Sequence, residues 1–301
     1  MTRLRAWLEL TRGANLPTVW SNLLVGWLLA VASGATLDGA SFPTLGAALL
    51  GATFLYTAGM FLNDAADAGW DRSHRPERPI ASGRIPLAQV AVAGATLLLL
   101  GVAAFLRVTP AALAAALVLA ALILAYTRWH KSRPAVAPWL MGACRAALPL
   151  IGFATAGSIP GGDAPGLLLA HALALGLATA GISLLARHES AGGVPGRAAT
   201  AVAWAALLPV PAFLLATGVV SWPVLIGLAG LGLGLSWTAT RLADIGSRVA
   251  VRIAGLALLD YLLWLAIRPA FDRADPLSQG GLMLLLFFGT ALALRRLLPS
   301  T

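Results

Sequence analysis

Charged residues are scarce in this sequence. They make up 11% of the 301 residues, whereas hydrophobic residues make up 59%. Soluble domains carry about 25% charged residues, so a soluble fold of this length would lack the polar side chains needed to cover its surface. The single cysteine, Cys144, excludes an intramolecular disulfide and a cysteine-based metal site. The sequence also lacks the alternation of apolar and polar residues that a membrane β-barrel strand requires.

The sequence consists largely of long apolar runs. A helix that crosses the hydrocarbon core needs about 20 apolar residues, and its backbone hydrogen bonds must be satisfied within the helix. The sequence therefore predicts an all-α, polytopic membrane bundle of nine to ten transmembrane helices, forming a single domain over residues 1–301. The expected spans are 14–35, 42–62, 87–106, 110–127, 137–158, 166–186, 199–218, 220–240, 251–268 and 279–297.

The distribution of Lys and Arg predicts the orientation. With a cytoplasmic N-terminus, ten spans leave most of the 21 Lys and Arg residues in cytoplasmic segments, and only Arg107, Arg268 and Arg273 in outer loops. This asymmetry is typical of multi-pass proteins. It accounts for the net charge of +9 without a nucleic-acid partner, and it predicts a partner of another kind, the lipid bilayer.

A row of polar residues follows the second span. Asn63, Asp67 and Asp71 recur every four residues, with Asp64 beside them, so a helix that continues beyond the span would stack them on one face. Carboxylates held so close repel one another unless a cation lies between them, and Mg²⁺ prefers oxygen ligands. We expect Asn63, Asp64, Asp67 and Asp71 to bind Mg²⁺.

Basic residues follow this row within the same loop. Arg72, Arg75 and Arg78 are placed to hold phosphate oxygens. Together with the carboxylates they indicate a diphosphate site at the membrane surface. A charged loop of this kind can also be a solvated connection only, but solvation does not require carboxylates in register over two helical turns.

The polar row and the loop after it resemble a motif of a known family. Asn63-Asp64-x-x-Asp67-x-x-x-Asp71, followed by Arg78-Pro79-Ile80-x-Ser82-Gly83, is similar to the first aspartate-rich motif of the UbiA superfamily of intramembrane prenyltransferases. The spacing after Asp71 resembles that of the chlorophyll-synthase branch, and the sequence Arg75-Pro76-Glu77-Arg78-Pro79 resembles that of the EboC group.

The resemblance implies a reaction and a set of residues. A polyprenyl diphosphate would ionise with the help of Mg²⁺, and its allylic cation would alkylate a lipophilic acceptor; Asn63, Asp67 and Asp71 would be the catalytic residues. Lys131 matches a basic position of the family that contacts diphosphate, although His130 matches it equally well. Arg145, a polar residue within a predicted span, is expected to line the pocket and to join the diphosphate site.

The second motif of the family is incomplete here. The matching segment contains Arg187, His188 and Glu189 where family members carry two or more aspartates. The resemblance implies that Glu189 assists a second metal ion and that Arg187 contacts phosphate in place of a metal charge. Both are expected across one cavity mouth from Asp67 and Asp71. The incomplete motif also fits a protein that binds or moves a lipid precursor without transferring it.

Two further function classes compete with these interpretations. A CDP-alcohol phosphotransferase would require an Asp-Gly followed by Ala-Arg within one carboxylate run, which Asp67-Ala68-Gly69 does not supply. An unrelated transporter remains an alternative. Asp260, in the middle of the ninth predicted span, is expected to pair with a cation on a neighbouring helix, and His171 is expected to be structural. The prenyl chain length, the acceptor and any protein partner cannot be predicted from these residues.

Overall fold

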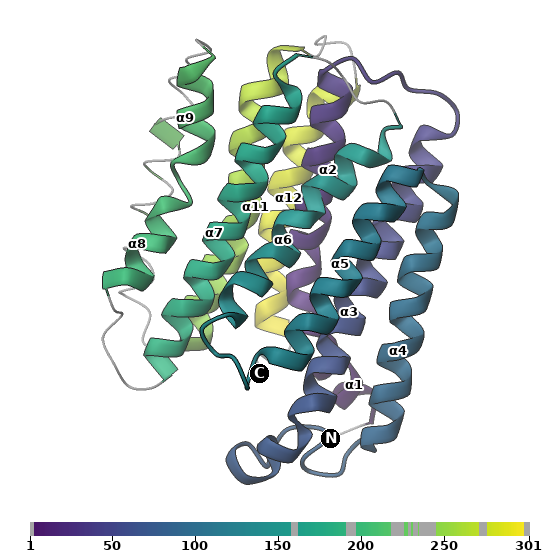
Figure 1. Cartoon of the computed structure of the whole chain (residues 1–301), viewed down its shortest axis with the longest axis vertical. Helices are drawn as coiled ribbons and strands as arrows, with labels where there is room; N and C mark the ends of the chain where they lie inside the picture. The colour runs from purple at the N-terminus through teal and green to yellow at the C-terminus, as the bar shows by residue number, and fades with distance from the viewer. Residues whose placement is uncertain are drawn as a thin grey trace.

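The computed structural model describes residues 3–157, 162–190, 197–217, 226–227, 230, 234, 245–270 and 276–297. Every regular element in these ranges is helical, and the long helices lie side by side in one bundle (Figure 1). The helices of the first half are α1 (Arg3–Thr11), η1 (Gly13–Asn15), α2 (Leu16–Ala32), α3 (Ser41–His74), α4 (Leu87–Ala104), η2 (Phe105–Arg107), α5 (Pro110–Trp129) and α6 (Ala137–Thr155). Those of the second half are α7 (Ala164–Ser190), α8 (Arg197–Ala205), α9 (Pro209–Ala216), α11 (Ile245–Ile267), η3 (Arg268–Ala270), η4 (Pro276–Gln279) and α12 (Gly280–Leu297).

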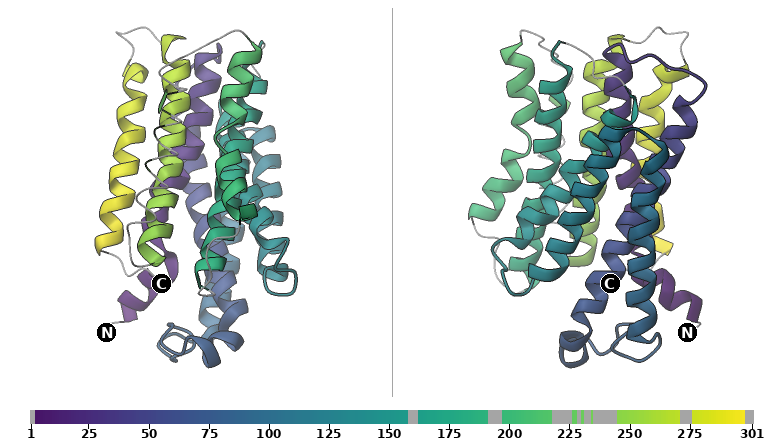
Figure 2. Two further views of the ribbon diagram at one scale, coloured as in Figure 1. Left: turned by 90° about the vertical axis from the view of Figure 1, so that its left-hand side faces the viewer. Right: turned by 45° about the vertical axis from the view of Figure 1, so that its right-hand side comes forward.

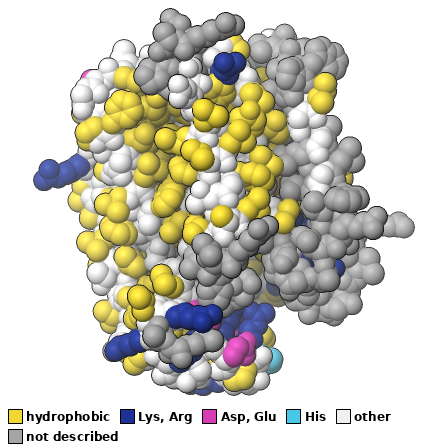
Figure 3. All heavy atoms as spheres, turned by 180° about the vertical axis from the view of Figure 1, so that it is seen from behind, with side chains coloured by type: hydrophobic (Ala, Val, Ile, Leu, Met, Phe, Trp, Pro, Cys, Tyr) yellow, Lys and Arg dark blue, Asp and Glu magenta, His cyan; other side chains and the backbone are white. Residues whose placement is uncertain are grey.

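The predicted fold class is confirmed: the protein is an all-α, multi-pass integral membrane protein. Within the described residues, 7 helices are long and apolar enough to cross a membrane. These are α2 to α7, which coincide with the first six predicted spans, and α12, which coincides with the tenth. The ninth predicted span coincides in position with α11, which is not counted among the 7. Hydrophobic side chains spread over the middle of the face shown in Figure 3, and charged side chains gather at its lower end.

Two predicted spans differ from the structure or fall outside it. The seventh, 199–218, is divided into α8 and α9, which are separated by a turn at 206–208 just before Pro209. Proline lacks the N–H that would continue the helical hydrogen bonds, so it begins a new helix more readily than it extends one. The eighth, 220–240, lies mostly outside the described residues.

Helix α2 forms the centre of the bundle and packs against α6, α11 and α12. Most of its side chains are buried, including the large Trp27. Its closest neighbour is α6, because Gly26 and Gly152 let the two backbones approach; a Cβ at Gly152 would overlap the carbonyl of Leu23. Small residues at such crossings are typical of membrane helices.

Helix α3 extends well beyond the predicted second span. It continues to His74 and, together with the start of α4, reaches past the ends of the neighbouring helices (Figures 1 and 2). The expectation that a helix carries the polar row is therefore confirmed. The row lies on the last turns of a helix whose earlier turns pack in the bundle, which holds its side chains in fixed directions.

Candidate functional site

The polar row on α3 faces the protein interior. Asn63, Asp64, Asp67 and Asp71 are between 3% and 8% exposed, although they lie at the polar end of the molecule. Carboxylates are rarely this buried unless they are paired. Each of the three aspartates here contacts basic side chains from other segments of the chain.

Asn63 and Asp67 form one half of the row. Asn63 Nδ2 lies 3.5 Å from Asp67 Oδ2, whereas Asp67 Oδ1 lies 2.8 Å from His130 Nε2 and 2.7 Å from Lys131 Nζ. The hydrogen bond with Asp67 raises the pKa of His130, against the opposing effect of burial. The sequence left open whether His130 or Lys131 occupies the basic position; both contact the same carboxylate, because they follow each other at the end of α5.

Asp64 and Asp71 form the other half and share one arginine. Arg78 Nη1 lies 3.3 Å from Asp64 Oδ1 and 3.3 Å from Asp71 Oδ2. Arg12 Nη2 donates to Asp64 Oδ1 at 2.8 Å. Arg12 has φ 46° and ψ 43°, in the left-handed region, which costs a non-glycine residue about 1 kcal/mol or more. This strained conformation lies at the junction of α1 and η1, and it directs the guanidinium of Arg12 toward Asp64.

The loop after α3 is built to hold Arg78 in place. The backbone N–H of Ser82 donates to the Arg78 carbonyl at 2.8 Å, and Gly83 closes the turn at φ 74°, a value that glycine adopts without strain. Ile80 and Ile85 pack against Ala6 and Leu10 of α1. The Arg-Pro-Ile-x-Ser-Gly run thus forms an anchored turn.

The oxygen ligands of the row fit a magnesium ion. Asn63 Oδ1 is buried and accepts no hydrogen bond, which is costly for a polar atom and leaves it available as a ligand next to Asp67. No group of three or more His, Cys, Asp or Glu side chains converges as a metal cluster anywhere in the described ranges. Mg²⁺ commonly binds one or two carboxylates, with phosphate oxygens and water completing its shell. Asn63 Oδ1 and Asp67 Oδ2 are oxygens of that kind, whereas Asp67 Oδ1 is already paired with His130 and Lys131.

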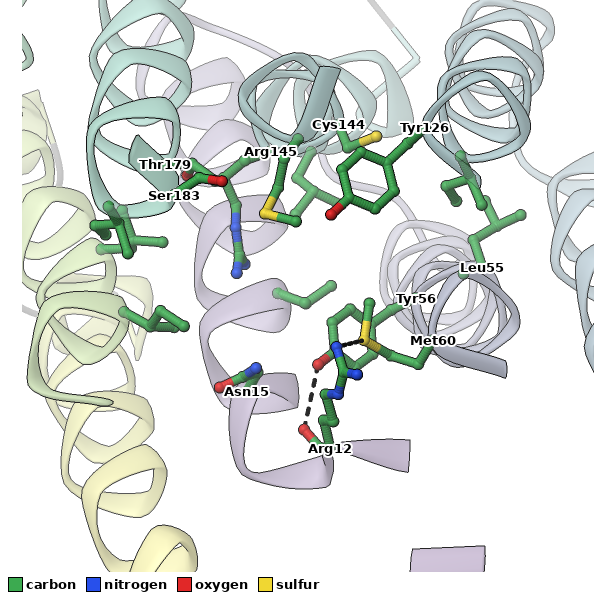
Figure 4. A pocket seen from close by; sticks show the side chains of 18 of the residues that line it. Arg12, Asn15, Leu55, Tyr56, Met60, Tyr126, Cys144, Arg145, Thr179 and Ser183 are labelled. Atoms are coloured by element: carbon green, nitrogen blue, oxygen red, sulfur yellow. Dashed lines mark hydrogen bonds between the residues drawn. The ribbon is translucent and has the colours of Figure 1, made fainter. Parts of the chain in front are cut away.

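A cavity of about 710 Å³ opens about one helical turn from the row, at Gly59 and Met60 of α3. Arg12, which contacts Asp64, also lines it, but none of the four residues of the row does. Its walls are mainly apolar and come from α2, α3, α5, α6, α7 and α11. Four arginines line it, namely Arg12, Arg75, Arg145 and Arg187. Figure 4 shows the side chains of Arg12, Arg145, Tyr56 and Tyr126 directed into one space. The lining contains no Asp or Glu among the described residues, so the cavity suits an amphiphile with an anionic head.

The predicted basic residues occupy different environments. Arg75 and Arg187 line the cavity, and Arg187 also donates to the carbonyl of Pro134. Arg78 contacts carboxylates, as described above, and Lys131 lies over the Trp70 ring at 4.4 Å as well as beside Asp67. Arg72 is exposed. The side chain of Glu189 lies outside the described residues, so of the expected second-motif pair only Arg187 can be placed, on the cavity wall.

A second polar cluster lies inside the bundle and was only partly predicted. Asp260 Oδ1 lies 2.9 Å from His171 Nε2, and Asp260 Oδ2 accepts from Ser21 Oγ and Asn22 Nδ2 at 2.5 Å and 2.7 Å. Asp260 therefore has a partner on a neighbouring helix, as expected, but that partner is His171, which carries a positive charge only when it is protonated. Sequence reasoning did not connect Asn22 and Arg145 to this cluster, because the contact depends on how α2, α6, α7 and α11 pack.

The fold and the site define a class: an intramembrane helical bundle in which buried carboxylates lie beside a cavity with an apolar interior and arginines on its wall. The chain belongs to the UbiA prenyltransferase family, whose family model matches residues 19–244. The expected family is thereby confirmed.

Two curated relatives carry the name digeranylgeranylglyceryl phosphate synthase. The protein from Ignicoccus hospitalis is 35% identical over 108 residues, covering 36% of this chain and 33% of the relative. That from Methanoregula boonei is 32% identical over 154 residues, covering 51% of this chain and 52% of the relative. The chain thus spans a third to about half of the length of the curated relatives it matches.

A solved structure shares the fold over nearly the whole chain. It is described as giving structural and mechanistic insights into digeranylgeranylglyceryl phosphate synthase in membranes, and it covers 97% of this chain with a TM-score of 0.60. At 18% identity the likeness concerns the arrangement of helices.

Proposed function

We propose that this chain is a Mg²⁺-dependent intramembrane prenyltransferase that moves a polyprenyl group from an allylic diphosphate to a lipophilic acceptor. The observation that carries the proposal is the buried Asn63–Asp67 pair, with one amide oxygen lacking a hydrogen-bond partner, beside a cavity with an apolar interior and arginines on its wall. Family membership supports the same reaction class. The chain acts as one domain in this proposal.

The residues of the row would hold the metal and the leaving group. Asn63 and Asp67 would hold Mg²⁺, and when bound the ion offsets the negative charge that develops on the departing diphosphate. Asp64 and Asp71 hold Arg78 in place, so that its charge balances theirs. Electrostatic groups fixed before the reaction cost no reorganisation during it.

Basic residues from different segments of the cavity wall would bind the diphosphate oxygens. Arg75 comes from the end of α3 and Arg187 from the end of α7, and both line the cavity. Lys131 adds a charge beside Asp67, and Arg72 is close in sequence. Arginine donates two parallel hydrogen bonds to phosphate oxygens, which would favour departure of the diphosphate.

The apolar wall would protect the allylic cation from water. Leu55, Leu119 and Ile123 line the cavity beyond its arginines. Exclusion of water prevents the hydrolysis that a solvated cation would undergo. The same wall suits a long prenyl tail and a lipophilic acceptor. We place this site at the cytoplasmic end of the bundle, because the positive residues of the loops gather there.

The relatives narrow the acceptor without defining it for this chain. Their names denote a glyceryl phosphate lipid, and we propose an acceptor that is likewise a lipid with a polar head. For the subgroup, two proposals compete. The spacing after Asp71 favours the chlorophyll-synthase branch, and the sequence around Pro76 favours the EboC group.

The test is transfer from a radiolabelled donor. The purified chain is incubated with geranylgeranyl diphosphate and a membrane-lipid extract, with Mg²⁺ or with EDTA, and labelled lipid products and released diphosphate are measured. We expect release that requires Mg²⁺ and that falls at least about 100-fold in Asp67→Asn, since the substitution removes the negative charge of a metal ligand.

The matched control is Glu77→Gln, an exposed carboxylate in the same loop, which should retain full activity. Binding of geranylgeranyl thiolodiphosphate, an unreactive analogue of the donor, together with no transfer from geranylgeranyl diphosphate itself, would instead favour a lipid-binding or lipid-moving protein, the function that the incomplete second motif suggests. Equal loss in Asp67→Asn and Glu77→Gln would contradict the role of the row.

A further inference from the structure

The buried cluster around Asp260 continues to the cavity wall. Asn22 links the two regions: its Nδ2 donates to Asp260, and its Oδ1 accepts from Arg145 Nη1 at 3.1 Å. Arg145 Nη1 also lies 3.2 Å from Thr18 Oγ1. Asp260, Asn22 and Thr18 are fully buried and His171 is 1% exposed. Polar side chains at this depth are costly and usually functional.

The guanidinium of Arg145 is directed toward the cavity. Thr18 and Asn22 both accept hydrogen bonds from the same nitrogen, Nη1. Arg145 is also one of the residues that line the cavity. Figure 4 shows its side chain pointing into the space that Tyr56 and Tyr126 also face. No carboxylate within the described ranges lies at ion-pair distance from it. Arg145 therefore presents hydrogen-bond donors and a positive charge to whatever occupies the inner cavity.

The depth of Arg145 separates it from the polar row. Trp20 lies between Thr18 and Asn22 on α2, and its Nε1 donates to Thr53 Oγ1 of α3 at 2.9 Å. Thr53 precedes Asp67 by 14 residues on the same helix, which corresponds to about 21 Å along the helix axis. A diphosphate group is much shorter than this separation. Asn63 is 10 residues from Thr53 on the same helix, or about 15 Å. We therefore expect a diphosphate held at Asn63 and Asp67 not to reach Arg145.

The role of Asp260 follows from the amide of Asn22. An asparagine amide has a donor end and an acceptor end. Because Asp260 accepts from the donor end, the acceptor end must face Arg145. Without a carboxylate at 260, the amide could rotate and turn its NH₂ group toward the guanidinium. Asp260 thus fixes the side chain that holds Arg145, and Ser21 and His171 hold Asp260 in turn.

We propose that Arg145 is an inner anion-binding residue, distinct from the Asn63–Asp71 row, and that Asp260 is its positioning residue, acting through Asn22. The ligand class is a lipid that carries an oxyanion, a phosphate or a carboxylate, at the end that enters the cavity. In terms of the proposed prenyl transfer, on which this inference rests, that lipid is the acceptor. The sequence had assigned Arg145 to the diphosphate.

The test measures two ligands on the purified full-length chain. Dodecyl phosphate is the ligand for Arg145, with dodecanol as its uncharged control and dodecanoate as the carboxylate analogue. Geranylgeranyl thiolodiphosphate with Mg²⁺ is the ligand for the polar row. We expect Arg145→Gln to weaken dodecyl phosphate binding about tenfold or more, as expected for the loss of a charge-assisted hydrogen bond. Binding of the thiolodiphosphate should change by less than about twofold in the same variant.

The positioning role of Asp260 is tested by a double-mutant cycle. Asp260→Asn should weaken dodecyl phosphate binding severalfold. The double variant Asp260→Asn with Arg145→Gln should bind dodecyl phosphate no more weakly than Arg145→Gln alone, because residues that act through one series of hydrogen bonds do not contribute additively. A merely structural Asp260 would give additive losses, which would overturn its role. Asn22→Ala offers a second variant if Asp260→Asn does not fold.

The outcomes separate this inference from the proposed function. Equal weakening of both ligands in Arg145→Gln would assign Arg145 to the diphosphate and overturn the inner site. Equal affinity for dodecyl phosphate and dodecanol would also overturn it. Failure of the wild-type chain to bind the thiolodiphosphate or to transfer its prenyl group would contradict the proposed function instead. A preference for dodecanoate over dodecyl phosphate would assign a carboxylate-bearing lipid within the proposed class.

Discussion

Removal of Arg78 should destabilise the protein as well as alter substrate binding. Its Nη1 lies 3.3 Å from a carboxylate oxygen of both Asp64 and Asp71, and those two side chains are 7% and 5% exposed. In Arg78→Ala, Asp64 keeps its bond to Arg12 at 2.8 Å, whereas Asp71 loses the only ion-pair partner that it has among the described residues. A buried charge that loses its partner is strongly destabilising.

The magnitude follows from these contacts. Hydrogen bonds to charged groups contribute about 1.5–3 kcal/mol each, and the two contacts of Arg78 are long. We therefore expect a loss of about 2–4 kcal/mol in the free energy of unfolding. In thermal unfolding of the detergent-solubilised chain this corresponds to a decrease on the order of 5 °C in Tm. Mg²⁺ should restore more stability to Arg78→Ala than to wild type, because it can offset the charge of the row.

The control is Arg72→Ala, which removes an exposed arginine one helical turn before the same loop and should leave Tm unchanged. Arg78→Lys should be intermediate, since lysine keeps the charge but loses the planar fork. A Tm for Arg78→Ala equal to that of wild type, with weaker diphosphate binding, would refute the reasoning and restore Arg78 to the role of a free phosphate ligand.

Two further predictions concern packing and cavity occupancy. Gly152→Ala should destabilise the chain by about 3 kcal/mol, the upper part of the range for overpacking, because the new methyl group would meet the Leu23 backbone; Gly39→Ala, which meets nothing within 4 Å, should be neutral in the same thermal unfolding assay. Cys144, the single cysteine, lines the cavity, so bound geranylgeranyl thiolodiphosphate should slow its modification by N-ethylmaleimide severalfold. Identical labelling rates with and without the analogue would argue against occupancy of this cavity.

The fold class and much of the polar row could be predicted because both depend on local patterns. Apolar run length identified most spans, and a spacing of four placed Asn63, Asp67 and Asp71 on the continued helix α3. The same reasoning could not foresee that the row divides into the pairs Asn63–Asp67 and Asp64–Asp71. That division is set by Arg12, Arg78, His130 and Lys131, which come from three different segments.

The sequence by itself determined that this chain crosses the membrane as helices and carries an oxygen-rich row at the end of one of them. These features follow from hydropathy and helical periodicity, which act over a few turns of one helix. Only the tertiary structure decided which charge faces which. Arg145 is held by Thr18 and Asn22 and is linked through Asn22 to Asp260, so its position depends on contacts among α2, α6 and α11. Residues more than 100 positions apart in the chain meet there, and no local pattern records such a contact.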